Sequence, residues 1–244
     1  MSSIYNDLPA PLILGHRGAP AEAPENTLRA FRLALEHGAD GVELDVQPSA
    51  DGVPVVIHDA TLERTTGSRG AVAALPWSAL RELRAGGEPI PCLEEVADWA
   101  AASGAWLNVE LKAVGAEAAS LAALAQAGVL ERTLFSSFLP EVVAEVGRLA
   151  PEARRYLLTE RWDANLREIA AEVEAGGICL ENRAVTPQAL HELAAARLPV
   201  VVWTVDEPAR IEALLHAGVA ALITNFPARG VAARRALAQG LPPQ

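Results

Sequence analysis

The chain has 244 residues and a formal net charge of −11, and about half of its residues are hydrophobic. This length fits one large domain or two small ones, and the apolar fraction is high enough to form a substantial core. The acidic balance argues against nucleic acid as a partner, because a protein that neutralises many phosphates carries a basic patch.

Sorting and anchoring signals are missing from the sequence. Residues 1–14 have no basic segment followed by a long apolar run, so they do not predict a secretory signal. No apolar run approaches the roughly 20 residues that a membrane span needs, so we expect no stable membrane insertion. Cys92 and Cys179 form neither a metal-ligand spacing nor a disulfide framework. These observations predict a soluble, cytoplasmic protein of unknown oligomeric state.

The first third of the chain predicts strands, one helix and an insertion. Short strands are expected at residues 12–14, 41–46 and 53–57, with an amphipathic helix over residues 26–37. Pro24 and Asn26 favour the start of that helix. Residues 60–92 break the rhythm with many glycines and prolines and one helix-like piece at 78–84. We interpret them as an insertion outside the main core.

The rest of the chain alternates regularly between the two kinds of element. Strands are expected at 106–111, 133–138, 154–158, 178–181, 199–205 and 221–224, and helices at 93–103, 116–126, 140–149, 163–174, 187–196, 208–217 and 228–238. With the first two strands, this gives eight strand–helix units. They predict an α/β fold of one domain, a (β/α)8 TIM barrel with a small insertion after the second strand. The alternative, an open doubly wound sheet, would need fewer strands.

Polar residues alternate with apolar ones at the ends of two predicted strands. Residues 42–46, V-E-L-D-V, put Glu43 and Asp45 on one face, and residues 108–112, N-V-E-L-K, do the same for Glu110 and Lys112. Because the apolar faces must pack against helices, the polar faces should point toward the barrel axis. Barrel active sites form at the carboxyl ends of strands, so we expect these side chains to meet there.

Three converging carboxylates need a compensating charge. Oxygen-only ligands favour a hard cation, Mg²⁺ or Ca²⁺, on Glu43, Asp45 and Glu110. The alternative is a set of ion pairs with Arg17 and Lys112, and the spacing is compatible with both. If a metal is bound, Arg17 and Lys112 beside it indicate an anionic substrate, most simply a phosphate.

Two histidines end separate strands close to the same carboxylates. An isolated histidine is usually structural, but two imidazoles beside a cation site, His16 and His58, can divide acid and base duties. Trp203 also lies at a strand end. It is a core residue by default, and the alternative role is an apolar wall for the organic part of a substrate.

These residues lie in motifs that resemble the glycerophosphodiester phosphodiesterase family over nearly the whole chain. The motifs are H-R-G at 16–18, P-E-N-T at 24–27, G-A-D-G-V-E-L-D-V at 38–46, D-G at 51–52, V-V-I-H-D at 55–59, N-V-E-L-K at 108–112, W-T-V-D at 203–206 and G-V-A-A-L-I-T-N-F-P at 218–227. Two positions depart from the family's common pattern. Asn225 stands where the family commonly has Asp, and Asp206 stands where it commonly has Asn.

The resemblance implies a barrel with an insertion and assigns roles to the residues above. It implies a divalent metal on Glu43, Asp45 and Glu110, catalytic His16 and His58, and substrate binding by Arg17 and Lys112, to which we add Trp203. The expected reaction is metal-dependent hydrolysis of a small-molecule glycerophosphodiester to glycerol 3-phosphate and an alcohol, by acid–base catalysis. The attacking oxygen could be water or the substrate's own glycerol 2-hydroxyl, and either histidine could be the acid.

Two other functions are alternatives to this one. A lysophospholipase D-type enzyme acting on lipid headgroups would want an exposed apolar rim, for which the insertion offers only scattered Leu75, Trp77, Leu80 and Leu83. A barrel that binds phosphodiesters without cleaving them is the other alternative, and the intact pair of histidines argues against it.

Overall fold

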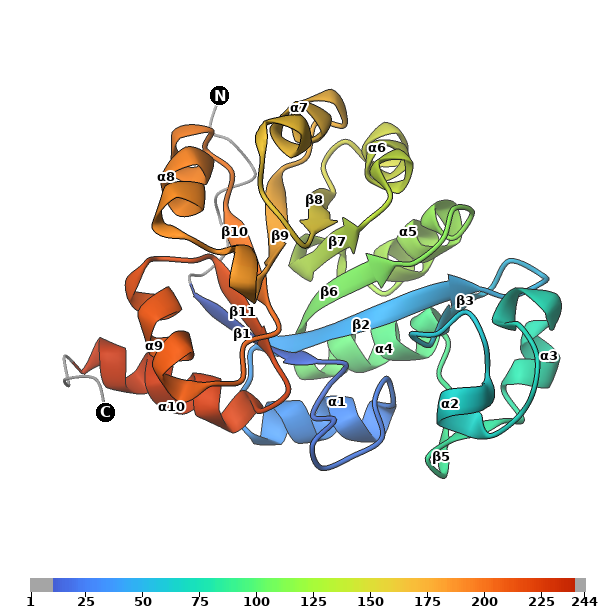
Figure 1. Ribbon diagram of the computed structural model, residues 1–244. Coiled ribbons are helices and arrows are strands. Elements are labelled where there is room, and N and C mark those ends of the chain that lie inside the picture. Colours follow the sequence, from blue (N-terminus) through green and yellow to red (C-terminus); the bar gives the residue numbers. More distant parts are fainter. Residues whose placement is uncertain (1–10, 240–244) are drawn as a thin grey trace.

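A computed structural model describes residues 11–239, and its central feature is a closed ring of parallel strands surrounded by helices (Figure 1). The ring strands are β1 (Leu12–His16), β2 (Gly41–Pro48), β6 (Trp106–Leu111), β7 (Thr133–Ser137), β8 (Arg154–Thr159), β9 (Gly177–Glu181), β10 (Val200–Trp203) and β11 (Ala221–Thr224). The ring closes because β1 pairs with both β11 and β2. The predicted (β/α)8 barrel is therefore confirmed, and the open sheet is excluded.

Helices follow the strands and cover the outside of the ring (Figure 1). They are α1 (Leu28–Glu36), α4 (Leu93–Ser103), α5 (Glu117–Gln126), α6 (Pro140–Leu149), α7 (Ala164–Glu172), α8 (Pro187–Ala195), α9 (Pro208–His216) and α10 (Pro227–Ala238), with short 3-10 turns η2 (Leu130–Arg132) and η3 (Asn182–Ala184). Among the described helices, none combines the length and apolarity that crossing a bilayer would require.

The core has two layers because the side chains of each strand alternate in direction. Val42, Leu44 and Val46 of β2 are fully buried in the cluster between the strands and the helices. Residues of the opposite orientation on other strands, such as Leu14 and Tyr156, form a second cluster. On β2 the positions between the valines and the leucine are Glu43 and Asp45, so the strand directs its carboxylates away from the helix layer.

Residues 54–89 form an arm beside the carboxyl end of β2 (Figure 1). The arm contains β3 (Pro54–Val56), α2 (Glu63–Thr66), η1 (Val72–Ala74), α3 (Trp77–Leu80), β4 (Arg84–Ala85) and β5 (Glu88–Pro89). Strand β3 pairs antiparallel with β2, and the arm has its own apolar cluster around Leu62 and Leu80. The helix expected at 78–84 is α3, which begins at Trp77 and ends at Leu80. It ends earlier than expected because the chain then turns into the β4–β5 hairpin.

Three expectations from the sequence stay predictions. The first concerns a secretory signal in residues 1–14, of which residues 1–10 lie outside the described part of the chain. The second is the cytoplasmic location, which stays a prediction. The third is the assignment of residues 60–92 as an insertion within a single domain, which also stays a prediction.

Candidate active site

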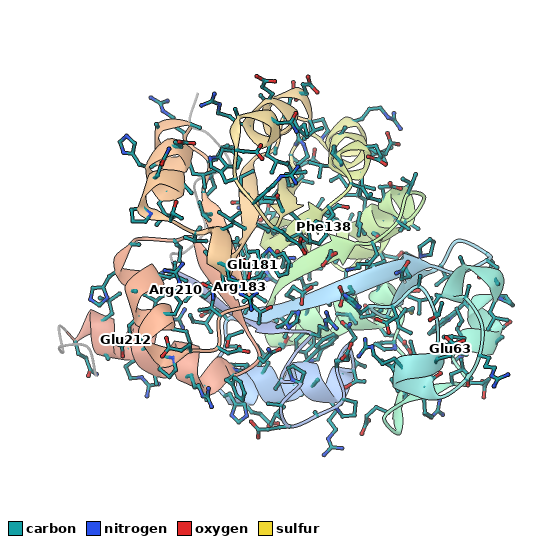
Figure 2. The ribbon with its side chains drawn as sticks, viewed as in Figure 1. Glu63, Phe138, Glu181, Arg183, Arg210 and Glu212 are labelled. Carbon is teal, nitrogen blue, oxygen red and sulfur yellow. The ribbon has the colours of Figure 1, made fainter. Side chains whose placement is uncertain are left out.

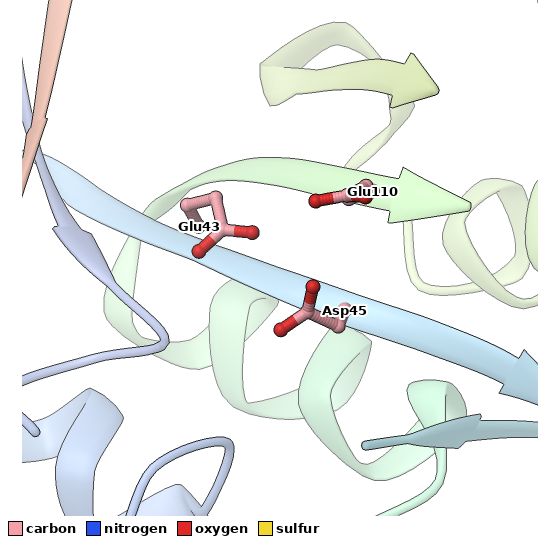
Figure 3. A group of neighbouring side chains, drawn as sticks. All are labelled: Glu43, Asp45 and Glu110. Carbon is pink, nitrogen blue, oxygen red and sulfur yellow. The ribbon is translucent and has the colours of Figure 1, made fainter. Parts of the chain in front are cut away.

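Three buried carboxylates meet on the neighbouring strands β2 and β6, with Glu43 and Asp45 within β2 and Glu110 near the end of β6 (Figure 3). Asp45 lies opposite Glu110 in the strand register, and Glu43 is two residues earlier on the same face as Asp45. One oxygen from each of the three lies within 4.8 Å of the others. Burial and the charges of Asp45 and Glu110 raise the pKa of Glu43 well above its usual range. Burial and Asp45 raise the pKa of Glu110 to about 7.

The donor set fits a hard divalent cation. All three candidate ligands offer oxygen, which Mg²⁺ and Ca²⁺ prefer. Asp45 Oδ1 is buried and accepts no hydrogen bond from any described residue. A buried carboxylate oxygen without a donor is costly, and a cation in the cluster would satisfy it and favour the ionised form of all three groups.

Arg17 and Lys112 lie against the same carboxylates. The Arg17 backbone, in the left-handed region at φ 52°, donates its N–H to Glu43 Oε2 at 2.9 Å. The side-chain Nε of Arg17 lies 3.2 Å from Asp45 Oδ2. Lys112 Nζ donates to Glu110 Oε1 at 2.7 Å and lies 3.5 Å from Asp45 Oδ1. These are the ion pairs of the alternative interpretation, and they involve the same three carboxylates that could hold a cation.

His16, at the end of β1, is held by residues of the barrel itself. Its Nδ1 lies 2.8 Å from Asn225 Oδ1, and Asn225 Nδ2 donates to Asp206 Oδ2 at 2.7 Å. A carboxylate has only acceptors, so the Asn225 amide must turn its NH₂ to Asp206 and its oxygen to His16. Nδ1 of His16 is therefore the protonated nitrogen, and Nε2, 4.0 Å from Glu43 Oε2, has the lone pair. Burial and the charge of Arg17 lower the pKa of His16.

His58 lies just beyond β3 and is held by a residue of the arm. Its Nδ1 lies 2.7 Å from Asp59 Oδ1, and its Nε2 lies 4.0 Å from Asp45 Oδ1. The Asp59 carboxylate also accepts hydrogen bonds from Arg64 at 2.6 and 3.0 Å. Hydrogen bonds from Arg64 and His58 lower the pKa of Asp59. Since ionised Asp59 can only accept, Nδ1 of His58 also carries a proton.

One pocket of about 210 Å³ joins the charged groups to an apolar wall. Its apolar lining is formed by Phe138, Leu158, Trp203 and Ile223. Phe138, labelled in Figure 2, meets Trp203 edge to face at 5.7 Å between ring centroids. Trp203 Nε1 donates to the Cys179 carbonyl at 3.2 Å. Trp203 thus anchors its polar atom in the barrel and presents part of its ring to the pocket.

The structure brings together all eight residues that the sequence proposed, seven of them as pocket lining and Asp45 through the carboxylate cluster. Other members of the site were missed. Asn26 was interpreted as a helix start, but Thr27 caps α1, and Asn26 donates instead to Asp45 Oδ2 at 2.8 Å. Two adjacent cap-type residues were the available signal, since one helix needs only one cap.

Glu25 and Arg64 were missed for a different reason. Glu25 accepts from Arg17 Nη1 at 2.8 Å and from both Arg64 terminal nitrogens. These contacts join a loop after β1 to the arm, at a separation of 39 residues between Glu25 and Arg64. No periodicity within either segment reports such a contact, because it depends on how the arm folds back over the barrel mouth.

The eight-stranded α/β barrel thus combines a carboxylate cluster that could hold a metal, two histidines and two positively charged side chains in one pocket, an arrangement suited to a phosphoester substrate. The profile of the Glycerophosphoryl diester phosphodiesterase family matches residues 16–229. The chain belongs to this family.

Relatives and solved structures agree with this assignment. A Glycerophosphodiester phosphodiesterase of Caldanaerobacter subterraneus subsp. tengcongensis is 33% identical over 229 residues, covering 88% of this chain and 94% of that protein. The structure of a glycerophosphoryl diester phosphodiesterase, described as putative, from Silicibacter pomeroyi matches with a TM-score of 0.85 at 28% identity, over 96% of this chain and 95% of that one.

A further similar structure holds a ligand. It is an Oleispira antarctica phosphodiesterase in complex with its product sn-glycerol-3-phosphate. It matches with a TM-score of 0.83 at 30% identity, over 94% of this chain and 98% of that chain.

Proposed function

We propose that this chain hydrolyses glycerophosphodiesters to glycerol 3-phosphate and an alcohol, with a divalent metal held by Glu43, Asp45 and Glu110. The observation that carries the proposal is the meeting of this cluster with His16 and His58 in one pocket. Family membership and the product bound by the Oleispira antarctica relative support the same substrate class.

The charged side chains bind and stabilise the phosphate. A bound Mg²⁺ or Ca²⁺ ion supplies positive charge that offsets the charge developing on the phosphoryl oxygens. The Arg17 and Lys112 side chains are about one-sixth exposed and line the pocket, so they can donate to the same oxygens. The apolar wall of Phe138 and Trp203 packs against the organic part of the substrate.

The two histidines take different roles because their Nδ1 partners differ. His16 faces the neutral amide of Asn225, which stabilises imidazolium less than a carboxylate would, so Nε2 accepts the proton of the attacking oxygen. His58 has the Asp59 carboxylate on Nδ1, which holds the ring with Nε2 toward the carboxylate cluster, and we assign to Nε2 the proton given to the departing alcohol oxygen. A P–O bond to the nucleophile forms as the P–O bond to the alcohol breaks. His16 then releases its proton to solvent, and His58 takes up a proton from solvent.

This proposal is favoured over the two alternatives. The apolar residues of the arm face its own interior: Leu80 is buried in the cluster, and Leu75, Trp77 and Leu83 pack against it. They offer little for a lipid surface, which disfavours a lysophospholipase D-type activity. A non-catalytic binding role has no specific observation in its favour.

The test is release of glycerol 3-phosphate from glycerophosphocholine by purified protein, in EDTA and after addition of Mg²⁺, Ca²⁺ or Mn²⁺. We expect release that EDTA abolishes and that a divalent ion restores, and the most effective ion identifies the metal. A Glu43→Gln variant is the control for metal bound elsewhere and should stay inactive with every ion. Folded protein that releases no product with any ion would refute the proposal.

A further inference from the structure

Arg64, in helix α2 of the arm, donates to two carboxylates at once. Its Nη1 and Nη2 donate to Glu25 Oε2 and Oε1 at 2.8 and 2.7 Å. Its Nε and Nη2 donate to Asp59 Oδ2 and Oδ1 at 2.6 and 3.0 Å. All three guanidinium nitrogens are therefore engaged in a planar fork that fixes both carboxylates relative to each other.

Each of these two carboxylates also accepts a hydrogen bond from a different residue of the pocket. Asp59 Oδ1 accepts from His58 Nδ1, and Glu25 Oε1 accepts from Arg17 Nη1 at 2.8 Å. Arg64 is thus connected to His58 through Asp59 and to Arg17 through Glu25. It makes no hydrogen bond to His58 or Arg17, and it is absent from the lining of the pocket.

We propose that Arg64 is a positioning residue, which holds His58 and Arg17 in the geometry needed for turnover by fixing Asp59 and Glu25. This inference rests on the proposed function for its kinetic consequence. It extends that function by assigning a task to the arm: the arm supplies the group that joins the two sides of the phosphate site.

The energetics separate this role from a purely structural one. The Arg64 side chain is 48% exposed, so its ion pairs add little to the free energy of unfolding. Orientation has a larger effect on rate, because a displacement of about 1 Å in a catalytic group can cost about 100-fold in turnover. A large loss of turnover with a small loss of stability is therefore the signature of positioning.

Both carboxylates are held in the acceptor state that this role requires. Hydrogen bonds from Arg64 and the charge of Arg17 outweigh burial and lower the pKa of Glu25 to about 2. Lysine at position 64 would keep the positive charge but would present one compact ammonium in place of the fork. Arg64→Lys therefore removes the geometry and keeps the charge.

The experiment compares Arg64→Lys and Arg64→Ala with the wild type on glycerophosphocholine, with metal present. Arg69→Ala is the matched control, since Arg69 is exposed in the same arm and makes no hydrogen bond or ion pair with any described residue. We expect kcat to fall about 10- to 100-fold in both Arg64 variants, the scale for partners that orient a catalytic ligand. Melting temperatures should stay close to that of the wild type, and Arg69→Ala should keep the wild-type kcat.

A second readout does not depend on activity. In ¹⁵N-histidine-labelled protein at a pH where the ring is neutral, wild-type His58 should show one tautomer, with its proton on Nδ1. In Arg64→Ala its two nitrogen shifts should converge while those of His16 stay unchanged. A kcat within about twofold of wild type in both Arg64 variants would overturn the inference. If the wild type itself is inactive, the proposed function fails, and an unchanged His58 spectrum in Arg64→Ala would then overturn the positioning role independently.

Discussion

The two sides of the catalytic pocket hold equivalent histidines by different means. His16 and His58 each direct Nε2 toward the carboxylate cluster at 4.0 Å. Behind His16 are Asn225 and Asp206, which belong to the barrel. Behind His58 is Asp59, which depends on the more exposed Arg64 of the arm.

The two sides differ in the chemical character of the group behind the histidine and in how firmly that group is held. His16, with a neutral amide behind it, has a lowered pKa, which suits a proton-accepting ring, whereas His58 has a carboxylate behind it and is assigned the proton-donating role. Asp206 accepts three hydrogen bonds, from Thr224 and from the backbone and side chain of Asn225, so the His16 side is fixed by the closing strands of the ring. The orientation of His58, in contrast, depends on Asp59 and Arg64 of the arm.

Removal of either histidine has the largest expected effect. His16→Ala and His58→Ala should each lower kcat on glycerophosphocholine by about 10²- to 10⁴-fold, because each removes one proton-transfer group. The measurement is steady-state release of glycerol 3-phosphate, with His191→Ala, in a helix far along the chain, as the control. Near-normal turnover in either variant would remove that histidine from the mechanism and end the comparison.

Changing the residues behind the histidines should have a smaller effect and should sharpen the comparison. Asp206→Asn allows the side-chain amide of Asn225 to flip and exchange its oxygen and NH₂, and Asp59→Asn removes the carboxylate behind His58. We expect each to lower kcat about 10- to 100-fold, as for other orienting partners. Asp98→Asn, an exposed change on α4, is the control. Equal activity of Asp59→Asn and the wild type would show that His58 needs no carboxylate behind it.

The smallest expected effect is on the pH dependence of stability, and it comes from Glu110 of the carboxylate cluster toward which both histidines point. In metal-free protein Glu110 has a pKa of about 7 against an ordinary value of 4.5. Between these values the folded state holds a proton that the unfolded chain releases, so stability should fall as pH rises through this window. Thermal denaturation in EDTA should show this fall, and it should be smaller in Glu110→Gln but unchanged in the exposed control Glu94→Gln. An identical pH dependence of Glu110→Gln and the wild type would contradict the assignment.

Much of the fold could be predicted from the sequence because its signals are local. The alternation of Val42, Leu44 and Val46 with Glu43 and Asp45 fixes which face of β2 is buried, and that pattern needs no tertiary information. The same alternation on successive strands placed the polar groups at one end of the ring. The ends of the arm's short helices were less predictable, because turns and a small apolar cluster determine them.

The parts of the site that were missed depend on contacts between distant segments. Asp206 and Asn225 were noticed as departures from the family pattern, but only the closed ring shows that they face each other and His16. Glu25 and Arg64 meet because the arm folds back toward the loop after β1. A carboxylate or arginine in a loop is compatible with many partners, so residue type alone does not select one.

The most direct test of the division between the two sides uses the leaving group. Losses caused by His16→Ala and His58→Ala are measured on glycerophosphocholine and on the glycerophosphodiester of p-nitrophenol, whose weakly basic phenoxide leaves without protonation. We predict that His58→Ala recovers most of its lost turnover with the p-nitrophenyl substrate, whereas His16→Ala stays impaired on both. Equal losses of His58→Ala on the two substrates, or recovery by His16→Ala, would contradict the assignment of His58 as the acid.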